Sequence, residues 1–212
     1  MWNRAILTAA GAVAVMAIAA GCGGGDSGTG HSADRGSTTS SSASAAPSSR
    51  DHNDADVVFA QHMIPHHQQA VEMSDMVLAK QGVNPRVTDL ATRIKAAQGP
   101  EIQQMQGWLG QWGNPPMPPM TSSEGHDNMP GMSSDAMGMM SDEQMTALKN
   151  ANGAESSKLF LTGMITHHEG AIAMAQNEIK DGSFAPAVEL ARSIVTTQQQ
   201  EIDTMKGILA TL

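Results

Sequence analysis

The sequence contains an internal repeat, which constrains the fold more than any other feature. Segment 59–73 recurs as segment 160–174, and both copies place Phe, Met-Ile, His-His, Ala and Met at the same spacing. A second block also recurs, in which six residues match six others 100 positions on: Ala91, Ile94, Gln98, Glu101, Ile102 and Met105 match Ala191, Ile194, Gln198, Glu201, Ile202 and Met205. Each copy therefore holds two helical segments. Two similar helical hairpins that pack together predict an all-α four-helix bundle.

Helix start signals divide each repeat. Asn84-Pro85 combines a favoured capping residue with a Pro that suits the first helical position, and Ser141 with Gln144 has the pattern of a capping box. We predict four helices, over residues 54–81, 85–112, 142–181 and 186–212. Pro65 and Gly99-Pro100 are predicted to kink the first two helices, and Asn152-Gly153 is a candidate break in the third.

The first 53 residues are predicted to lie outside the bundle. Residues 1–21 are typical of a secretory signal peptide, because a charged start precedes an apolar run that is too short to span a membrane. Small residues then precede Cys22, the single Cys, as a bacterial lipoprotein signal requires; an ordinary secreted protein with one unpaired Cys is the alternative. Segment 22–53 is rich in Gly and Ser and is predicted to be a flexible tether.

These features predict an extracytoplasmic, lipid-anchored protein. Its folded domain is expected at 54–212, with a first repeat at 54–112, a linker at 113–140 and a second repeat at 141–212. The net charge is −9 and no basic run occurs, which argues against nucleic-acid binding. No Ser lies in a nucleophile-elbow motif, so no catalytic residue is predicted.

Polar residues share the predicted inner faces of the helices. At 100° per residue, His62, His66 and Gln69 fall on one stripe of the first helix, and His167 falls on the matching stripe of the third. His67 and His168 point about 100° away, toward helix–helix seams. The second and fourth helices place four polar residues between apolar neighbours: Gln98, Glu101, Gln198 and Glu201. A buried carboxylate is costly unless it is paired or bound to a metal.

We therefore expect a polar network at the bundle centre, with two interpretations. In one, the imidazoles donate to Glu and Gln, and the network only fixes how the helices pair. In the other, the same groups bind a metal. Imidazole nitrogens with Met thioethers one turn away favour copper, as Cu(I) or Cu(II), or silver. The predicted ligands from this pattern are His62, His66, His67, His167, His168, Glu101 and Glu201.

The linker and the residues just after it are rich in Met. Eight of the chain's 17 Met lie there: Met117, Met120, Met129, Met132, Met137, Met139, Met140 and Met145. Because Pro and Gly oppose a regular helix, we predict a flexible loop in which these Met have no packing role. Spaced thioethers near a His suit Cu(I) or Ag(I), which predicts a second site from Met117, Met120, His126, Met129 and Met132. The alternative is a linker whose composition is free to vary and whose Met side chains fold onto the bundle surface.

Segments 62–73 and 164–174 resemble the doubled Met-Ile-x-His-His motif of the DUF305 family, which comprises exported bacterial proteins. The resemblance covers about residues 54–212 and implies a ferritin-like four-helix core. Some members are linked to periplasmic copper binding and copper resistance. Carried over, this implies metal binding by His66, His67, His167 and His168, with Met63, Met73, Met164 and Met174 as auxiliary ligands. The chain departs from its relatives at Pro100, which interrupts a helix that looks continuous in them, directly before Glu101.

Three functions remain open from the sequence. The first is copper or silver sequestration without turnover. The second is a di-iron or di-manganese oxidoreductase, suggested by the ferritin-like core, although such centres use Glu-x-x-His pairs and none occurs in this sequence. The third is a metal-free helical binding module. A homo-oligomer in which a second copy completes a half-filled site is a further alternative.

Overall fold

The computed structural model describes residues 51–115 and 137–212. The predicted signal peptide, the lipidation at Cys22 and most of the predicted tether lie outside the described residues. The same holds for the predicted loop site of Met117, Met120, His126, Met129 and Met132. Within the described residues, no helix is long and apolar enough to cross a membrane.

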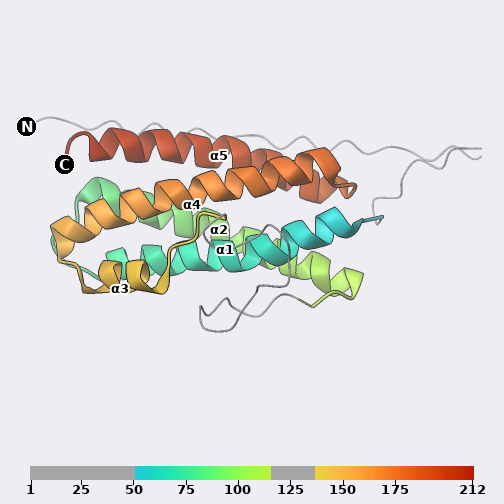
Figure 1. The fold of residues 1–212 in the computed structure, drawn as a ribbon, viewed down its shortest axis with the longest axis horizontal. Coiled ribbons are helices and arrows are strands. Elements are labelled where there is room, and N and C mark those ends of the chain that lie inside the picture. Colours follow the sequence, from blue (N-terminus) through green and yellow to red (C-terminus); the bar gives the residue numbers. More distant parts are fainter. Residues whose placement is uncertain (1–50, 116–136) are drawn as a thin grey trace, which may run out of the picture. The chain divides into compact units, whose positions relative to one another are not determined.

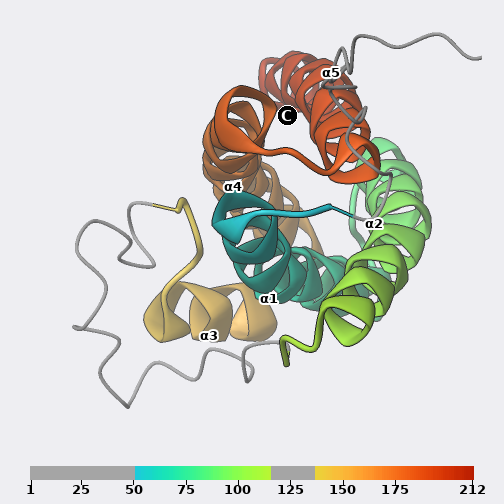
Figure 2. The same cartoon turned by 90° about the vertical axis from the view of Figure 1, so that its right-hand side faces the viewer.

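Four long helices form the bundle that the repeat predicts (Figure 1). The first hairpin consists of α1 (Asp54–Leu78) and α2 (Pro85–Trp112), and the second consists of α4 (Gly153–Asp181) and α5 (Ala185–Leu209). Each hairpin packs mainly on itself, and α1 against α4 forms the main contact between the two. A short helix, α3 (Asp142–Asn150), lies beside α1 and α4 (Figure 2). The prediction of an all-α bundle is confirmed.

Capping residues explain where the helices begin. Asn53 and Asp56 form a capping box at α1, Asn84 accepts from Arg86 N at 2.9 Å, and Ser141 forms the predicted box with Gln144. Such caps satisfy backbone N–H groups that the first helical turn leaves free.

Several predicted helix boundaries and interruptions differ from the structure. The helix predicted over 142–181 is divided at its candidate break, Asn152-Gly153, because Asn152 caps a new helix that begins at Gly153. The helices predicted to end at Gln81 and Leu212 end at Leu78 and Leu209. Neither predicted kink site ends its helix: α1 continues through Pro65 and α2 through Pro100.

Two apolar clusters form the core of the bundle. The first contains Phe59, Met63, Ile64, Met105, Leu109, Met174, Phe184 and Ile194 among others. The second contains Met73, Val77, Leu90, Ile94, Phe160, Leu161, Met164 and Met205 among others. Each large side chain that is fully removed from water stabilises the fold by about 1.5–3 kcal/mol.

Polar residues separate the two clusters on every long helix. On α1, His66 and His67 follow Ile64 of the first cluster and precede Ala70 of the second. Gln98 of α2 likewise lies between Ile94 of the second cluster and Met105 of the first. We define the central polar layer as the eight residues His66, His67, Gln98, Glu101, His167, His168, Gln198 and Glu201. This layer is the polar network that the sequence predicts.

The last residues of the linker pack into the bundle. Residues 137–140, which we call the Met strap, are described, and Met137, Met139 and Met140 are buried. The prediction that these three Met have no packing role is therefore wrong. The strap is held at its ends by α1, because His66 Nε2 lies 3.0 Å from Met137 O and the Gln69 amide both donates to and accepts from the Met140 backbone, at 2.9 and 2.8 Å.

Glycines of the second repeat make room for the Met strap. Gly163 and Gly170 of α4 occupy the positions that His62 and Gln69 occupy in α1. A Cβ on Gly170 would lie 1.7 Å from Met137 O, and a Cβ on Gly163 would lie 2.7 Å from Met140 Sδ. The Met strap thus packs where the two repeats differ, against glycines of α4 that replace His62 and Gln69 of α1.

Candidate functional site

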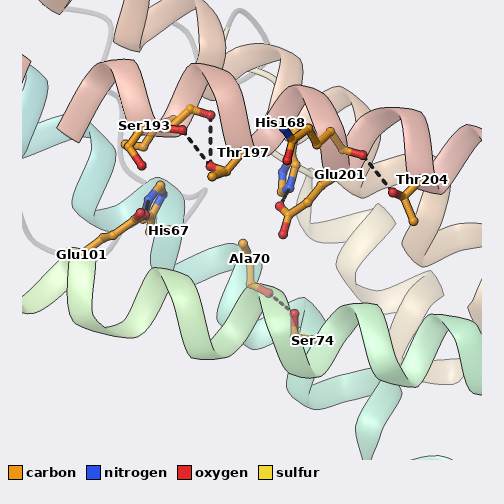
Figure 3. Close-up of polar contacts among 11 residues, drawn as sticks. His67, Ala70, Ser74, Glu101, His168, Ser193, Thr197, Glu201 and Thr204 are labelled. Carbon is orange, nitrogen blue, oxygen red and sulfur yellow. Dashed lines mark hydrogen bonds and ion pairs between the residues drawn. The ribbon is translucent and has the colours of Figure 1, made fainter. Parts of the chain in front are cut away.

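Each hairpin contains one His–Glu pair, at matching positions of the two repeats (Figure 3). His67 Nε2 lies 2.7 Å from Glu101 Oε2, and His168 Nε2 lies 2.7 Å from Glu201 Oε2. Both rings are fully buried, whereas the two Glu side chains are about one-fifth exposed. The match shows that Pro100 does not displace Glu101 from the position of its counterpart in the second repeat. A carboxylate that accepts from Nε2–H leaves Nδ1 of a neutral ring with its lone pair free.

A second pair of rings meets across the two hairpins. The centroids of His66 and His167 are 3.6 Å apart with an interplanar angle of 34°, and both residues are fully buried. His66 Nε2 faces the carbonyl oxygen of Met137, so this nitrogen carries the hydrogen and Nδ1 carries a lone pair. Neither ring nitrogen of His167 has a hydrogen-bond partner among the described residues.

Burial keeps this ring pair neutral. Removal from water, and after it the neighbouring His67, lower the pKa of His66 to about 3. The pKa of His167 also lies well below the usual value, through burial first and then through His66; the backbone of His66 opposes the shift as the smallest cause. Both rings are therefore uncharged near neutral pH, which is the form of imidazole that binds metals.

Unsatisfied polar atoms concentrate in the central polar layer. Eight buried nitrogen and oxygen atoms of the layer have no hydrogen-bond partner among the described residues: His66 Nδ1, His67 Nδ1, both amide atoms of Gln98, both ring nitrogens of His167, His168 Nδ1 and Gln198 Oε1. Buried polar atoms in native proteins nearly always have partners, and unpaired ones mark a water or an ion. Within the described residues, no three or more His, Cys, Asp or Glu converge on one point to hold an ion.

The four predicted auxiliary Met are buried around the layer. Met63 and Met164 lie one turn before the His-His pairs of α1 and α4, and both are fully buried. Met73 is also fully buried, and Met174 is 7% exposed. These thioethers belong to the two apolar clusters, so packing alone accounts for their burial.

The structure places His62 in a pocket that none of the other predicted His ligands lines. It lines a small pocket of about 80 Å³ between α1 and α4 with Met174, and its Nδ1 donates to Val58 O of its own helix at 2.8 Å. His62 belongs to the predicted stripe with His66 and Gln69, but it lies one turn closer to the start of α1, beside the end of α4.

Sequence reasoning missed a buried carboxyl pair at the same end of the bundle. Asp56 accepts from the backbone N–H groups of Asn53, Ser183 and Phe184, and although burial opposes the effect, these bonds hold its pKa below the usual value. Burial and the neighbouring Asp56 raise the pKa of Glu178 to about 8. As a carboxylate Glu178 has no donor among the described residues, but as an acid it bonds to Asp56.

Replacing Glu178 with Gln should remove a loss of stability at alkaline pH. Because the pKa of Glu178 is higher in the folded than in the unfolded chain, the folded protein keeps a proton between about pH 4.5 and pH 8, and its free energy of unfolding falls as pH rises through this window. Urea unfolding at about pH 6 and about pH 9 should show this fall in the wild type and not in Glu178→Gln. Glu169→Gln, an exposed site on the same helix, is the control. If the free energy of unfolding fell equally in Glu178→Gln and Glu169→Gln, the raised pKa would not belong to Glu178.

The comparisons with known proteins settle the family. The family model described as "Domain of unknown function (DUF305)" matches residues 56–209. The chain belongs to the DUF305 family. A solved DUF305 fragment from Deinococcus radiodurans is 33% identical with a TM-score of 0.66, and it covers 76% of this chain and 98% of its own. A DUF305 protein from Streptomyces coelicolor, described as a putative secreted protein, is 33% identical with a TM-score of 0.63, and covers 74% of this chain and 91% of its own.

CopM is a third structural relative of this DUF305 protein. Its Cu(I)-bound form is 29% identical with a TM-score of 0.57, and covers 74% of this chain and 96% of its own. CopM has also been solved with Cu(II) and with Ag. No protein with curated function matches the chain.

Proposed function

We propose that this protein binds Cu(I) or Ag(I) in its central polar layer and sequesters the ion outside the cytoplasm, where a lipid on Cys22 anchors it. The observation that carries the metal-binding part is the buried, neutral ring pair of His66 and His167 where the two hairpins meet, in which three ring nitrogens lack partners among the described residues. The location and the anchor rest on the sequence of residues 1–22 alone, namely the short apolar run and the single Cys that follows it.

His66 and His167 form the core of the proposed site. The two rings come from different hairpins, each has a nitrogen lone pair available, and both are neutral because burial lowers their pKa values. Monovalent copper and silver accept as few as two or three ligands, so two imidazoles with one thioether from Met63 or Met164 make a complete set. Soft thioethers favour Cu(I) and Ag(I) over harder divalent ions.

The His–Glu pairs support the site from outside the first ligands. Glu101 and Glu201 hold the Nε2–H groups of His67 and His168, which orients these rings and leaves each buried Nδ1 without a partner among the described residues. Carboxylates in this position commonly fix the tautomer of ligand His residues and raise their basicity. Because both carboxylates are bonded to His rings, they give no support to a di-metal oxidoreductase, in which the Glu residues are themselves metal ligands.

The similarity to CopM supports the class of ion. CopM binds copper and silver with a fold that this chain shares over 74% of its length. Sequence identity near 30% makes a shared ion class a reasonable expectation, and the unpaired nitrogens of this chain supply donors for it independently.

Removing both central rings should weaken metal binding. In the full chain, His66→Ala combined with His167→Ala is expected to lower Cu(I) affinity by about 100-fold or more, since loss of even an outer partner of a ligand costs about 10–100-fold. Competition against a chromophoric Cu(I) chelator measures this. His52→Ala, which removes a ring stacked on Trp112 outside the layer, is the control. Unchanged affinity in the double variant would exclude the central site.

The predicted loop site is tested separately. Replacing Met117, Met120, Met129 and Met132 with Leu, and His126 with Ala, leaves the central polar layer intact. If these changes remove ions while the central double variant does not, copper binds to the linker and the bundle serves as its scaffold.

A further inference from the structure

A small pocket between α1 and α4 brings an imidazole and a thioether together at the bundle end. It has a volume of about 80 Å³ and is lined by His62 and Phe59 from α1 and by Met174 and Glu178 from α4, among others. Both donors are on helices that the caps and the apolar clusters fix in place. The pocket is open to solvent on one side, because Asn177 and Asp181 at its edge are exposed.

The tautomer of His62 leaves a donor available. Its Nδ1 faces the carbonyl oxygen of Val58 at 2.8 Å, so Nδ1 carries the hydrogen and Nε2 carries the lone pair. Within the described part of the chain Nε2 has no hydrogen-bond partner, and unlike the unpaired nitrogens of His66 and His167 it is not among the fully enclosed atoms. His62 therefore directs Nε2 toward a pocket that an ion from solvent can reach.

The thioether of Met174 differs from its counterpart in the first repeat. Met73, the matching residue, is fully buried, whereas Met174 keeps 7% of its surface exposed and lines the pocket. In the second repeat, Gly163 stands where His62 would be, and Met140 of the Met strap covers it. The strap thus occupies the symmetry-related position, and the pairing of His62 with Met174 has no equivalent there.

The nearby carboxyl groups are occupied. Asp56 accepts hydrogen bonds from Ser183 and Phe184, and Glu178, whose pKa is raised to about 8, keeps its proton at neutral pH and bonds to Asp56. Asn177 and Asp181 place oxygen atoms at the exposed edge of the pocket, and its more buried donors are one imidazole nitrogen and one thioether sulfur. This pair favours a soft monovalent ion over Zn²⁺ or Mg²⁺, which take more nitrogen or oxygen ligands.

We infer that His62 Nε2 and Met174 Sδ form a second, solvent-accessible site for Ag(I) or Cu(I), separate from the central polar layer. The inference rests on the proposed function only for the class of ion. The pocket is suited to first capture, since it opens to solvent on the same inter-hairpin face along which His66 and His167 are fully buried.

The test is a titration of the full chain with Ag(I), followed by long-range ¹H–¹⁵N spectra of the His rings and by native mass spectrometry. We expect the His62 Nε2 resonance to shift on binding, and both His62→Gln and Met174→Leu to bind one Ag(I) fewer per chain than wild type. Met174→Leu keeps the side-chain volume, so it preserves packing if His62→Gln does not. His52→Gln is the control and should bind as wild type.

The outcomes separate the two proposed sites. A shift of His62 that persists in the His66→Ala, His167→Ala double variant supports the pocket whether or not the central layer binds. Shifts of His66 and His167 with no shift of His62 at saturating Ag(I), or an unchanged ion count in both pocket variants, would overturn the inference while leaving the central site standing.

Discussion

Acidifying the metal-free protein from about pH 6.5 to about pH 3 is expected to lower its free energy of unfolding by on the order of 4 kcal/mol through His66 alone. The pKa of this ring falls from 6.5 to about 3 on folding, because burial disfavours the charged form. Between these pH values the unfolded chain binds a proton that the folded chain does not, so stability falls as pH falls. His167 acts in the same direction.

Urea unfolding at several pH values, with a chelator present, measures this dependence. The slope of the free energy of unfolding against pH gives the number of protons taken up on unfolding. Between about pH 4 and pH 6 this number should be smaller by about one in His66→Gln, because one of the two buried rings is gone. His52→Gln, outside the central polar layer, should leave the slope as in wild type. If His66→Gln and wild type lose stability in parallel, His66 is not a buried neutral ring in the folded state.

Replacing Gly170 with Ala is expected to destabilise the protein by about 1–3 kcal/mol, the usual cost of inserting an atom into a packed site. The new Cβ would lie 1.7 Å from Met137 O and 3.0 Å from Gly138 N, and backbone atoms cannot turn aside as a flexible side chain can. The Met strap must then move, which breaks the contact of Met137 with His66 and strains the Gln69 bonds to Met140.

Gly107→Ala is the matched control for this substitution. Gly107 lies in α2, and a Cβ added there would meet no neighbouring atom within 4 Å, so Ala should stabilise the helix by about 0.5–1 kcal/mol. Thermal unfolding gives the two changes, and hydrogen exchange at the Met140 amide reports on the strap directly. Equal stabilisation by both substitutions would show that the strap does not pack against Gly170.

Much of the fold could be predicted from the repeat. A repeated segment implies similar hairpins, and polar residues at matching positions of both copies imply a shared layer. Which His pairs with which Glu, namely His67 with Glu101 and His168 with Glu201, is seen only in the folded chain. Local capping residues correctly predicted the helix starts at Pro85 and Asp142, because a cap depends on neighbours within one turn. The helix ends at Leu78 and Leu209 were less accessible, since helix C-termini carry weaker signals here.

The differences between the repeats carried information that periodicity does not reveal. Gly163 and Gly170 interrupt the polar stripe of α4, and only the folded chain shows that Met137 and Met140 fill the space they leave. Asp56 and Glu178 meet because the start of α1 lies beside the end of α4, and no local pattern links residues so far apart. The separation of His62 from His66 likewise depends on which part of α4 lies opposite each turn of α1.

The most direct test of the central claim is an anomalous difference map from crystals of the silver-loaded protein. The account predicts an ion bound to His66 and His167, with a thioether of Met63 or Met164 as its neighbour, in the layer between the two apolar clusters. Silver found only on surface or linker residues, with the centroids of the two central rings still 3.6 Å apart, would contradict it.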